Sequence, residues 1–195
     1  MKKFLQDLPA CISVDVETAG PNPHSYALLS IGACTLTRPH QTFYIELKPD
    51  KLNFQTQAVE IHGLDLARLT VEGVEPEQAL IRFEQWLNQV IPVQIQPIFL
   101  AFNAPFDWMF VNDYFNSYLG RNPFGHNALD IKAFYMGMTG VRWSQTTLAH
   151  VAVHLDKPCS LTHHALADAQ AQAQLFRALL DAARQRDATK HSATD

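Results

Sequence analysis

The chain has 195 residues, of which 47% are hydrophobic and 17% are charged, and its formal net charge is −4. This composition predicts a globular protein with a sizeable core and excludes a disordered or fibrous chain. The 15 Lys and Arg residues are scattered singly, whereas a protein that grips long duplexes through their phosphates usually shows a basic stripe.

The first part of the chain predicts three strands in succession. Residues 11–18 and 27–37 are apolar runs rich in β-branched side chains, and the turn-forming residues 20–23 (Gly-Pro-Asn-Pro) separate them. Residues 41–47 form a third, alternating run after a break at 38–40. Because the links are short, we expect these strands to form an antiparallel meander.

Helices and strands alternate in the remainder of the chain, after a linker that contains Ile61 and His62. Apolar residues recur at helical spacing in the predicted helices, while the predicted strands are short apolar runs. In chain order, these elements are a helix at 75–90, a strand at 97–101, a helix at 105–119, a strand at 128–131, and helices at 145–155 and 164–184. The polar residues 186–195 are expected to form a disordered C-terminal tail.

This order of elements predicts an α/β fold. Three strands followed by alternating strands and helices indicate a mixed five-stranded sheet, in which an antiparallel meander of strands 1–3 is extended by parallel strands 4–5 and helices pack on both faces. The chain shows no internal repeat and no second domain, so we expect a single domain over residues 1–185. Functional side chains in such sheets gather where strands end and helices begin.

The sequence predicts neither a membrane protein nor a secreted one. Residues 26–36 are the longest apolar stretch, which is too short to cross a bilayer, and polar residues interrupt the N-terminal segment before a signal-peptide core can form. We therefore expect a cytoplasmic protein. The cysteines are odd in number and widely spaced among apolar neighbours, which predicts reduced, buried thiols at Cys11, Cys34 and Cys159.

Asp15 and Glu17 are the first candidate functional pair. In a strand, residues i and i+2 point to the same face, so these two carboxylates are presented together while Val14 and Val16 face the opposite layer. A strand with two surface acids is the alternative interpretation. The apolar neighbours favour a buried strand, where carboxylates are costly unless a cation such as a divalent metal ion neutralises them.

Two acids and a histidine further along the chain complete the candidate set. Asp107 lies in the opening turn of the 105–119 helix, where the helix dipole alone would also favour an acid. His163 and Asp168 would lie about 140° apart on one regular helix, so we expect His163 in the preceding loop and Asp168 in the second turn. Asp130, at a strand end, either orients the site or caps the next turn, and we leave it out of the catalytic set.

Three segments, in this order, resemble the DnaQ-like, or DEDDh, family of 3′–5′ exonucleases, which have an RNase H-like fold. They are Ser-Val-Asp-Val-Glu-Thr-Ala-Gly from residue 13 with Leu-Ser-Ile-Gly-Ala from residue 29, Asn-Ala-Pro-Phe-Asp from residue 103, and His-His-Ala-Leu-Ala-Asp-Ala from residue 163. The resemblance covers residues 11 to about 176. It implies that four carboxylates hold two divalent metal ions, Mg²⁺ or Mn²⁺, beside a histidine base. The ligands would be Asp15, Glu17, Asp107 and Asp168, and the general base His163.

The resemblance also implies residues that hold the 3′-terminal nucleotide. These would be Thr18, through its backbone near the terminal hydroxyl, together with Ile61, His62 and Phe106. For Ile61 and Phe106, ordinary packing is an equally good interpretation. The departures from the family pattern, at residues 19 and 101–102, touch no metal ligand and bear on substrate preference.

The expected function is a metal-dependent 3′–5′ exonuclease that hydrolyses phosphodiester bonds at the 3′ ends of single-stranded DNA or RNA and releases nucleoside monophosphates. Two metal ions would stabilise charge on the attacking and leaving oxygens, and a neutral imidazole can take a proton from water near physiological pH. The alternatives are a non-catalytic nucleic-acid or protein-binding module of the same fold and a metal-dependent nucleotide phosphohydrolase. No membrane partner is expected, and the sequence leaves both a monomer and a homodimer open.

Overall fold

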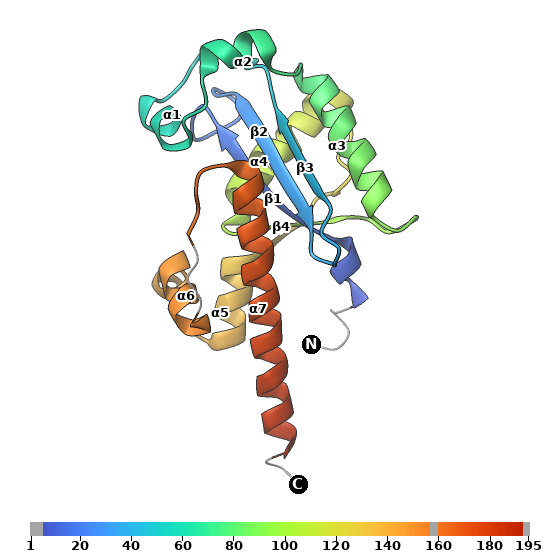
Figure 1. The fold of residues 1–195 in the computed structure, drawn as a ribbon, viewed down its shortest axis with the longest axis vertical. Coiled ribbons are helices and arrows are strands. Elements are labelled where there is room, and N and C mark those ends of the chain that lie inside the picture. The colour runs from blue at the N-terminus through green and yellow to red at the C-terminus, as the bar shows by residue number, and fades with distance from the viewer. Residues whose placement is uncertain (1–5, 157–159, 193–195) are drawn as a thin grey trace.

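The five predicted strands form one mixed sheet in the computed structural model, which describes residues 6–156 and 160–192 (Figure 1). The strand order is β3-β2-β1-β4-β5. The antiparallel meander consists of β1 (Cys11–Thr18), β2 (Leu28–Thr35) and β3 (Thr42–Glu46). The strands β4 (Ile98–Ala101) and β5 (Ala128–Asp130) extend the sheet in parallel to β1. The predicted α/β architecture is confirmed.

Helices cover both faces of this sheet, as the sequence predicts (Figure 1). In chain order they are α1 (Thr56–His62), α2 (Leu66–Glu72), α3 (Pro76–Val90), α4 (Ala104–Leu119), α5 (Ile131–Thr139), α6 (Leu148–Leu155) and α7 (Ala165–Ser192). The short 3₁₀ helices η2 (Leu8–Ala10) and η3 (Trp143–Gln145) precede β1 and α6. The helices α3 and α4 pack on one face, whereas α7 crosses the other with α5 and α6 beside it.

Alternation along β1 separates the two layers of the core. Ile12, Val14 and Val16 belong to the larger apolar cluster, which β1 shares with α3 and α4. Cys11 belongs instead to the second cluster, which contains buried side chains of α7. Because side chains of the same parity point to the same face, the two acids of β1 face the α7 layer.

The helix α7 approaches the sheet closely at Gly32. Gly32 is the β2 partner of Asp15, and a Cβ atom built on it would lie 2.1 Å from the backbone carbonyl carbon of Ala165. No other residue type leaves this space, so the first turn of α7 lies directly against β2. This close approach brings Asp168 towards Asp15.

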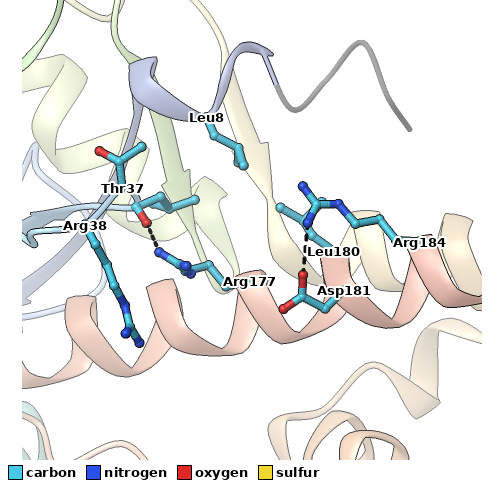
Figure 2. A pocket seen from close by; sticks show the side chains of 8 residues that line it. Leu8, Thr37, Arg38, Arg177, Leu180, Asp181 and Arg184 are labelled. Carbon is cyan, nitrogen blue, oxygen red and sulfur yellow. Dashed lines mark hydrogen bonds and ion pairs between the residues drawn. The ribbon is translucent and has the colours of Figure 1, made fainter.

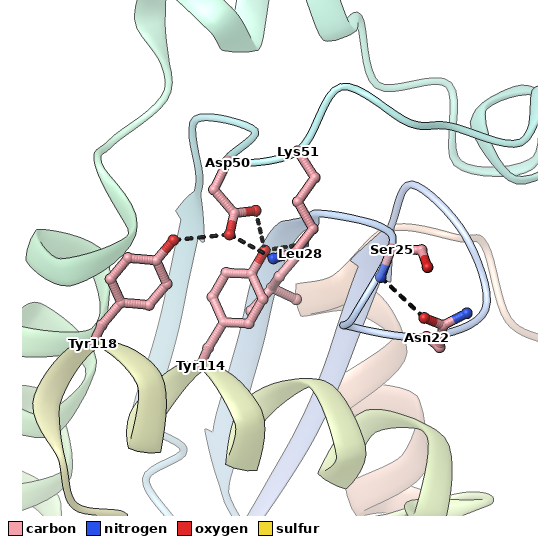
Figure 3. Close-up of polar contacts among 7 residues, drawn as sticks. All are labelled: Asn22, Ser25, Leu28, Asp50, Lys51, Tyr114 and Tyr118. Atoms are coloured by element: carbon pink, nitrogen blue, oxygen red, sulfur yellow. Dashed lines mark hydrogen bonds and ion pairs between the residues drawn. The ribbon is translucent and has the colours of Figure 1, made fainter.

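A polar cluster ties the loop after β3 to α4 and to the start of β2 (Figure 3). In this Asp50 cluster, Asp50 Oδ2 accepts hydrogen bonds from Lys51 Nζ at 2.6 Å and from Tyr118 Oη at 2.8 Å. The Tyr114 hydroxyl donates to Asp50 Oδ1 and accepts the Leu28 N–H at 2.8 Å. The register of β1 and β2 shifts at this end, so the cluster fixes the irregular part of the ladder.

The prediction of a linker before the 75–90 helix is wrong, because this segment contains the helices α1 and α2. Each has seven residues, α1 buries no side chain fully, and Leu69 is the buried residue of α2. Hydrophobic periodicity, on which the prediction depends, is therefore weak in both. Asp65 is the local signal for α2, since its carboxylate accepts the N–H groups of Ala67 and Arg68 and caps this helix.

Two other boundaries differ from the prediction. Ile131, predicted as the last residue of the fifth strand, begins α5, a helix that the sequence analysis does not predict, and the carboxylate of Asp130 caps this helix. The helix α7 continues to Ser192, although the sequence pattern predicts its end at Arg184 and a disordered polar tail from residue 186. Residues 185–192 contain no Gly or Pro, so nothing in the backbone stops the helix there.

Cys11 and Cys34 are buried free thiols, as predicted. Burial raises the pKa of each thiol to about 12, so both stay protonated at neutral pH. Cys159 lies outside the described residues. Among the residues that the structure describes, no helix combines the length and the apolar character needed to cross a bilayer.

Candidate active site

The strand β1 presents Asp15 and Glu17 on the face that α7 covers. Glu17 is 9% exposed and Asp15 is partly buried. The neighbouring strand β4 pairs with β1 only at residues 11–13, so the acids stand beyond the last strand pair on that side. They therefore lie at an open edge of the sheet, where a helix can approach them.

Asp107 closes this edge from α4. It is 5% exposed in the first turn of the helix, and its Oδ1 accepts the Val16 N–H at 3.1 Å. The start of α4 is in turn held by Asp130, whose Oδ2 accepts the Ala104 N–H at 2.7 Å while its Oδ1 accepts the Ala133 N–H at 2.7 Å. Asp130 thus caps α5 and also orients the helix that carries Asp107.

The loop before α7 presents His163 and folds around Asp168. His163 precedes the helix, as predicted, whereas Asp168 lies in its first turn and not in the second. Asp168 Oδ1 accepts the Thr162 N–H at 2.7 Å and the Thr162 hydroxyl at 3.0 Å, and Oδ2 accepts the His163 N–H at 2.9 Å. These bonds hold His163 at φ +57°, a left-handed conformation that is uncommon outside glycine.

The fold brings all five predicted catalytic residues to one place. The potential ligand atoms of Glu17, His163 and Asp168 lie within 4.8 Å of one another. Asp15 is close enough to the other three acids for each of them to raise its pKa, and Glu17 acts on Asp107 in the same way. We call Asp15, Glu17, Asp107 and Asp168 the acid site.

Burial and mutual repulsion raise the pKa of three of these acids. Burial, followed by the charges of its acidic neighbours, raises the pKa of Asp15 well above its usual value, although a hydrogen bond from Gln172 opposes the shift. Burial and then the charge of Asp168 raise the pKa of Glu17 to about 7. Burial raises the pKa of Asp107 to about 8 against the effect of its backbone hydrogen bonds. Without bound cations, ionisation of these three carboxyl groups in the folded chain is therefore unfavourable.

The donor set fits hard divalent cations. All four acids offer carboxylate oxygens, which Mg²⁺ and similar ions prefer. In the part of the chain that the structure describes, no ion pair with Lys or Arg neutralises any of them. Bound cations would supply positive charge at these acids, lower their raised pKa values and so favour the ionised carboxylates.

Two of the residues predicted to hold a terminal nucleotide lie close to the acid site. Thr18 is buried at the end of β1, and its hydroxyl donates to the Gly20 carbonyl at 2.9 Å. His62 is the last residue of α1, and its Nδ1 accepts the Leu64 N–H at 3.0 Å. Burial lowers the pKa of His62, the backbone of Thr18 opposes this shift, and the nearby His163 adds to it. His62 therefore lies beside both residues.

The two apolar residues in this group differ in their surroundings. Ile61 is 49% exposed at the end of α1, so its side chain is available to a ligand. Phe106 packs against the larger core cluster and against Phe110, with 5.5 Å between the ring centroids. Packing against the core therefore accounts for much of the surroundings of the Phe106 side chain. The sequence analysis gives such packing as an equal alternative to nucleotide binding.

Gln172 belongs to the site, although the sequence analysis does not single it out. It is 1% exposed on α7, its Nε2 donates to Asp15 Oδ1 at 2.6 Å, and its Oε1 accepts the Phe102 N–H at 2.8 Å. A usable signal exists in the sequence, because Gln172 follows Asp168 by four residues and so lies on the same helical face among apolar residues. A buried amide there predicts a polar partner.

A separate pocket of about 240 Å³ lies between η2, the end of β2 and the later turns of α7 (Figure 2). Arg177 Nη1 donates to the Leu36 carbonyl at 2.5 Å, and Arg184 pairs with Asp181 at 3.3 Å. The lining also includes Arg38. The fold thus gathers three arginines that the sequence shows as scattered, at a distance along α7 from the acid site.

Comparisons with known proteins find exonucleases. Residues 12–176 match the RNase_T family, which is described as "Exonuclease". The 3′-5′ DNA exonuclease Cap18 of Escherichia coli is 45% identical over 166 residues, which cover 85% of this chain and 89% of the relative. Ribonuclease T of Yersinia pseudotuberculosis is 31% identical over 183 residues, which cover 87% of this chain and 84% of the relative.

Solved structures are similar in fold. The nuclease domain of 3′hExo, described as a DEDDh family member bound to rAMP, has a TM-score of 0.72 and 18% identity, with 88% of this chain and 92% of that chain covered. A longer 3′-exonuclease, described in its recognition of a histone mRNA stem-loop, has a TM-score of 0.70 and 16% identity. The match covers 88% of this chain and 63% of that longer protein.

Proposed function

Because the chain belongs to the RNase_T exonuclease family and is a DEDDh-type 3′–5′ exonuclease with an RNase H-like fold, we propose that it hydrolyses phosphodiester bonds at the 3′ ends of single-stranded DNA or RNA and releases nucleoside monophosphates. The observation that carries this proposal is a cluster at the end of β1, where His163 meets four acids that pair with no Lys or Arg of the described residues. The name of the 45% identical relative favours DNA as the preferred strand.

His163 is the general base in this proposal. Its ring lies beside Glu17 and Asp168, with potential ligand atoms of the three residues within 4.8 Å of one another, so water held at the acid site is within its reach. The neutral imidazole takes a proton from that water as the oxygen attacks phosphorus. The bond from phosphorus to the 3′ oxygen of the preceding nucleotide breaks, this oxygen takes a proton from solvent, and a nucleoside 5′-monophosphate leaves.

Two divalent cations, Mg²⁺ or Mn²⁺, would be held by Asp15, Glu17, Asp107 and Asp168. When bound, such ions stabilise negative charge on the attacking and leaving oxygens and lower the pKa of water. The chain itself aims the carboxylates, since a backbone N–H of β1 fixes Asp107 and the Gln172 amide fixes Asp15. Fixed orientation matters because catalysis is sensitive to misplacement of about 1 Å.

The terminal nucleotide would lie between the end of β1 and the end of α1. The Thr18 backbone would contact its 3′ hydroxyl, and the exposed side chain of Ile61 would cover its base. His62 and Phe106 would complete this surface. The electrostatic effect of His163 on His62 supports the placement, because it puts the end of α1 beside the proposed base.

Digestion of end-labelled single-stranded DNA and RNA of several lengths, with Mn²⁺ or Mg²⁺, tests the proposal. We expect stepwise release of mononucleotides from the 3′ end. Glu17→Gln should lower the rate by about three orders of magnitude, which corresponds to about 4 kcal/mol of transition-state stabilisation. Glu77→Gln is the matched control, since Glu77 is an exposed acid of α3 and loses the same charge.

The outcomes separate this proposal from its alternatives. Full activity in a folded Glu17→Gln protein would refute the assignment of the metal ligands. Consumption of free nucleotides with oligonucleotides left intact would indicate a phosphohydrolase. A protein that digests neither and gains no thermal stability from divalent ions would be a binding module.

A further inference from the structure

The proposed base stands on an exposed loop that leads into α7. His163 has φ +57°, and its N–H donates to Asp168 Oδ2 at 2.9 Å, so α7 holds one side of the loop. Among the described residues, no hydrogen bond holds the His163 ring itself. The direction of this ring therefore depends on how the backbone of the loop is held, and the next residue, His164, supplies a second contact.

His164 stacks on Tyr44 of β3. The ring centroids are 4.7 Å apart and the planes meet at 20°, which is a stacked pair. His164 and Tyr44 are both near the surface, yet the pair joins the loop before α7 to the outermost strand of the meander. The loop is thus held on one side by Asp168 and on the other by β3.

Tyr44 is a rigid platform for this contact. Its hydroxyl donates to Glu46 Oε1 at 2.9 Å, and Glu46 Oε2 pairs with Arg68 Nη2 of α2 at 2.6 Å. Partial burial and the bond to Glu46 raise the pKa of Tyr44, so the hydroxyl remains a donor at neutral pH. The ring of Tyr44 is therefore fixed at both its strand and its hydroxyl end.

We propose that Tyr44 and His164 are positioning residues, whose stacked rings hold the His163 loop so that the imidazole of His163 faces the acid site. This inference rests on the proposed role of His163. Neither ring touches the reacting atoms in it: the pair acts through the backbone of residues 163–164. Loss of the stack lets the His163 ring move away from Glu17 and Asp168 and slows the proton transfer.

Kinetics of ring-removing and ring-keeping variants test the proposal. Tyr44→Leu and His164→Ala should each lower kcat about 10- to 100-fold, as expected for a displaced catalytic group, with KM for single-stranded DNA and the Mn²⁺ concentration for half-maximal activity changed less than about twofold. Tyr44→Phe and His164→Phe keep two stacked rings and should retain most of kcat, and His164→Phe also tests whether the long Ala167 N–H bond to His164 Nδ1 at 3.5 Å is dispensable. The double variant Tyr44→Leu/His164→Ala should be about as slow as the slower single variant, because each single change already breaks the stacked pair that the two residues share.

Control variants and a folding measurement accompany these kinetics. His126→Ala removes an exposed histidine elsewhere and should leave kcat unchanged. Thermal unfolding of each variant shows whether it is folded, and His164, which is exposed, is replaceable without loss of a buried side chain. His163→Ala, measured in parallel, shows whether the side chain of His163 is needed for nucleotide release.

Each result has one meaning. Unchanged kcat in both ring-removing variants, with His163→Ala inactive, overturns the positioning role and leaves the proposed function intact. A higher KM with kcat preserved also overturns it, because the rings would then be a stacking surface for substrate bases. Full activity in His163→Ala refutes the proposed base itself, and the positioning role falls with it.

Discussion

Asp50 and Asp107 carry the same functional group in opposite environments. Burial acts to raise the pKa of Asp50, but hydrogen bonds from Lys51, Tyr114 and Tyr118 outweigh it and hold the pKa below its usual value (Figure 3). Burial acts on Asp107 without a cationic partner, and its pKa rises to about 8. The chain can therefore build a balanced carboxylate site from its own side chains, and it does not do so at the acid site.

This difference distinguishes a structural carboxylate from a functional one. The Asp50 cluster is complete as it stands and joins α4 to the meander. Without a ligand, the acid site lowers the free energy of unfolding near neutral pH, because burial and neighbouring like charges oppose ionisation of its carboxyl groups. A site that is destabilising by itself and made of metal-binding groups is expected where bound cations are part of the function.

The largest expected effect is on catalysis. Asp107→Asn should lower the rate of nucleotide release about 10³-fold, because it removes an oxygen ligand from the acid site. Asp50→Asn should change the rate per folded molecule less than about threefold. Single-turnover assays on end-labelled DNA measure both. Comparable losses in the two variants would remove the distinction between the clusters.

A second expected effect concerns the distance between α7 and β2. Gly32→Ala places a methyl group where the Ala165 backbone lies, so the first turn of α7 must move and carry Asp168 with it. We expect activity to fall about 100-fold and half-maximal activity to need more Mn²⁺. Gly137→Ala is the control, because a Cβ at Gly137 meets no atom within 4 Å. Equal activity in the two variants would contradict this account of the helix approach.

A third expected effect is a pH dependence of stability. The pKa values of Glu17 and Asp107 are raised to about 7 and about 8, so between about pH 4 and pH 8 these two groups hold more protons in the metal-free folded chain than in the unfolded chain. Their contribution to the free energy of unfolding therefore falls as the pH rises through this window. We expect Tm without metal to decrease on the order of 5 °C from pH 5 to pH 8.

Divalent ions should flatten this pH dependence, because they favour the ionised carboxylates. Scanning calorimetry with EDTA and with Mg²⁺ measures both profiles. Glu17→Gln without metal should also lose part of the decrease. An identical slope with and without Mg²⁺ would show that the acid site does not bind the ion.

The smallest expected effect is at the Asp50 cluster. Asp50→Asn should lower the free energy of unfolding at pH 7 by about 1 kcal/mol, a value reduced by solvent screening of this partly exposed carboxylate. Because the folded pKa of Asp50 is lowered, its contribution is present above the unfolded pKa and is lost as the pH falls through the folded value. Tyr114→Phe should cost about 1–2 kcal/mol, since the Leu28 N–H loses its acceptor.

Urea unfolding at pH 7 and at pH 3 measures these losses. The Asp50→Asn difference should shrink at the lower pH, while the part of the Tyr114→Phe difference that comes from Leu28 should remain. If Asp50→Asn instead stabilised the protein at pH 7, Asp50 would be a destabilising carboxylate like those of the acid site, and the comparison would fail.

Long, regular elements were predictable because each carries a strong local signal. The apolar β-branched runs give β1 and β2, and the helical spacing between residues 75 and 90 gives α3. The short helices α1, α2 and α5 were missed because few of their side chains are buried, and hydrophobic periodicity records burial. For α2 and α5, the capping residues Asp65 and Asp130 are the better signal.

The residues of the candidate site also divide into those that the sequence predicts and those that it does not. Asp15, Glu17, Asp107, His163 and Asp168 were selected as acids among apolar residues together with a motif resemblance, and the structure places them side by side. Gln172 and the Tyr44–His164 stack were not selected, because an amide and an aromatic pair have meaning only when their partners are known. The partner of Gln172 lies 157 residues away, and the partner of His164 lies on β3.

The sequence by itself determined which groups are available and which local element presents each one: period-two alternation puts Asp15 and Glu17 on one face, and a helix start carries Asp107. Tertiary structure decided the rest. The approach of α7 at Gly32, the Val16 hydrogen bond to Asp107 and the gathering of three arginines around one pocket all join residues far apart in the chain. Electrostatic interactions depend on distance and burial in space, and neither quantity is written in the local sequence.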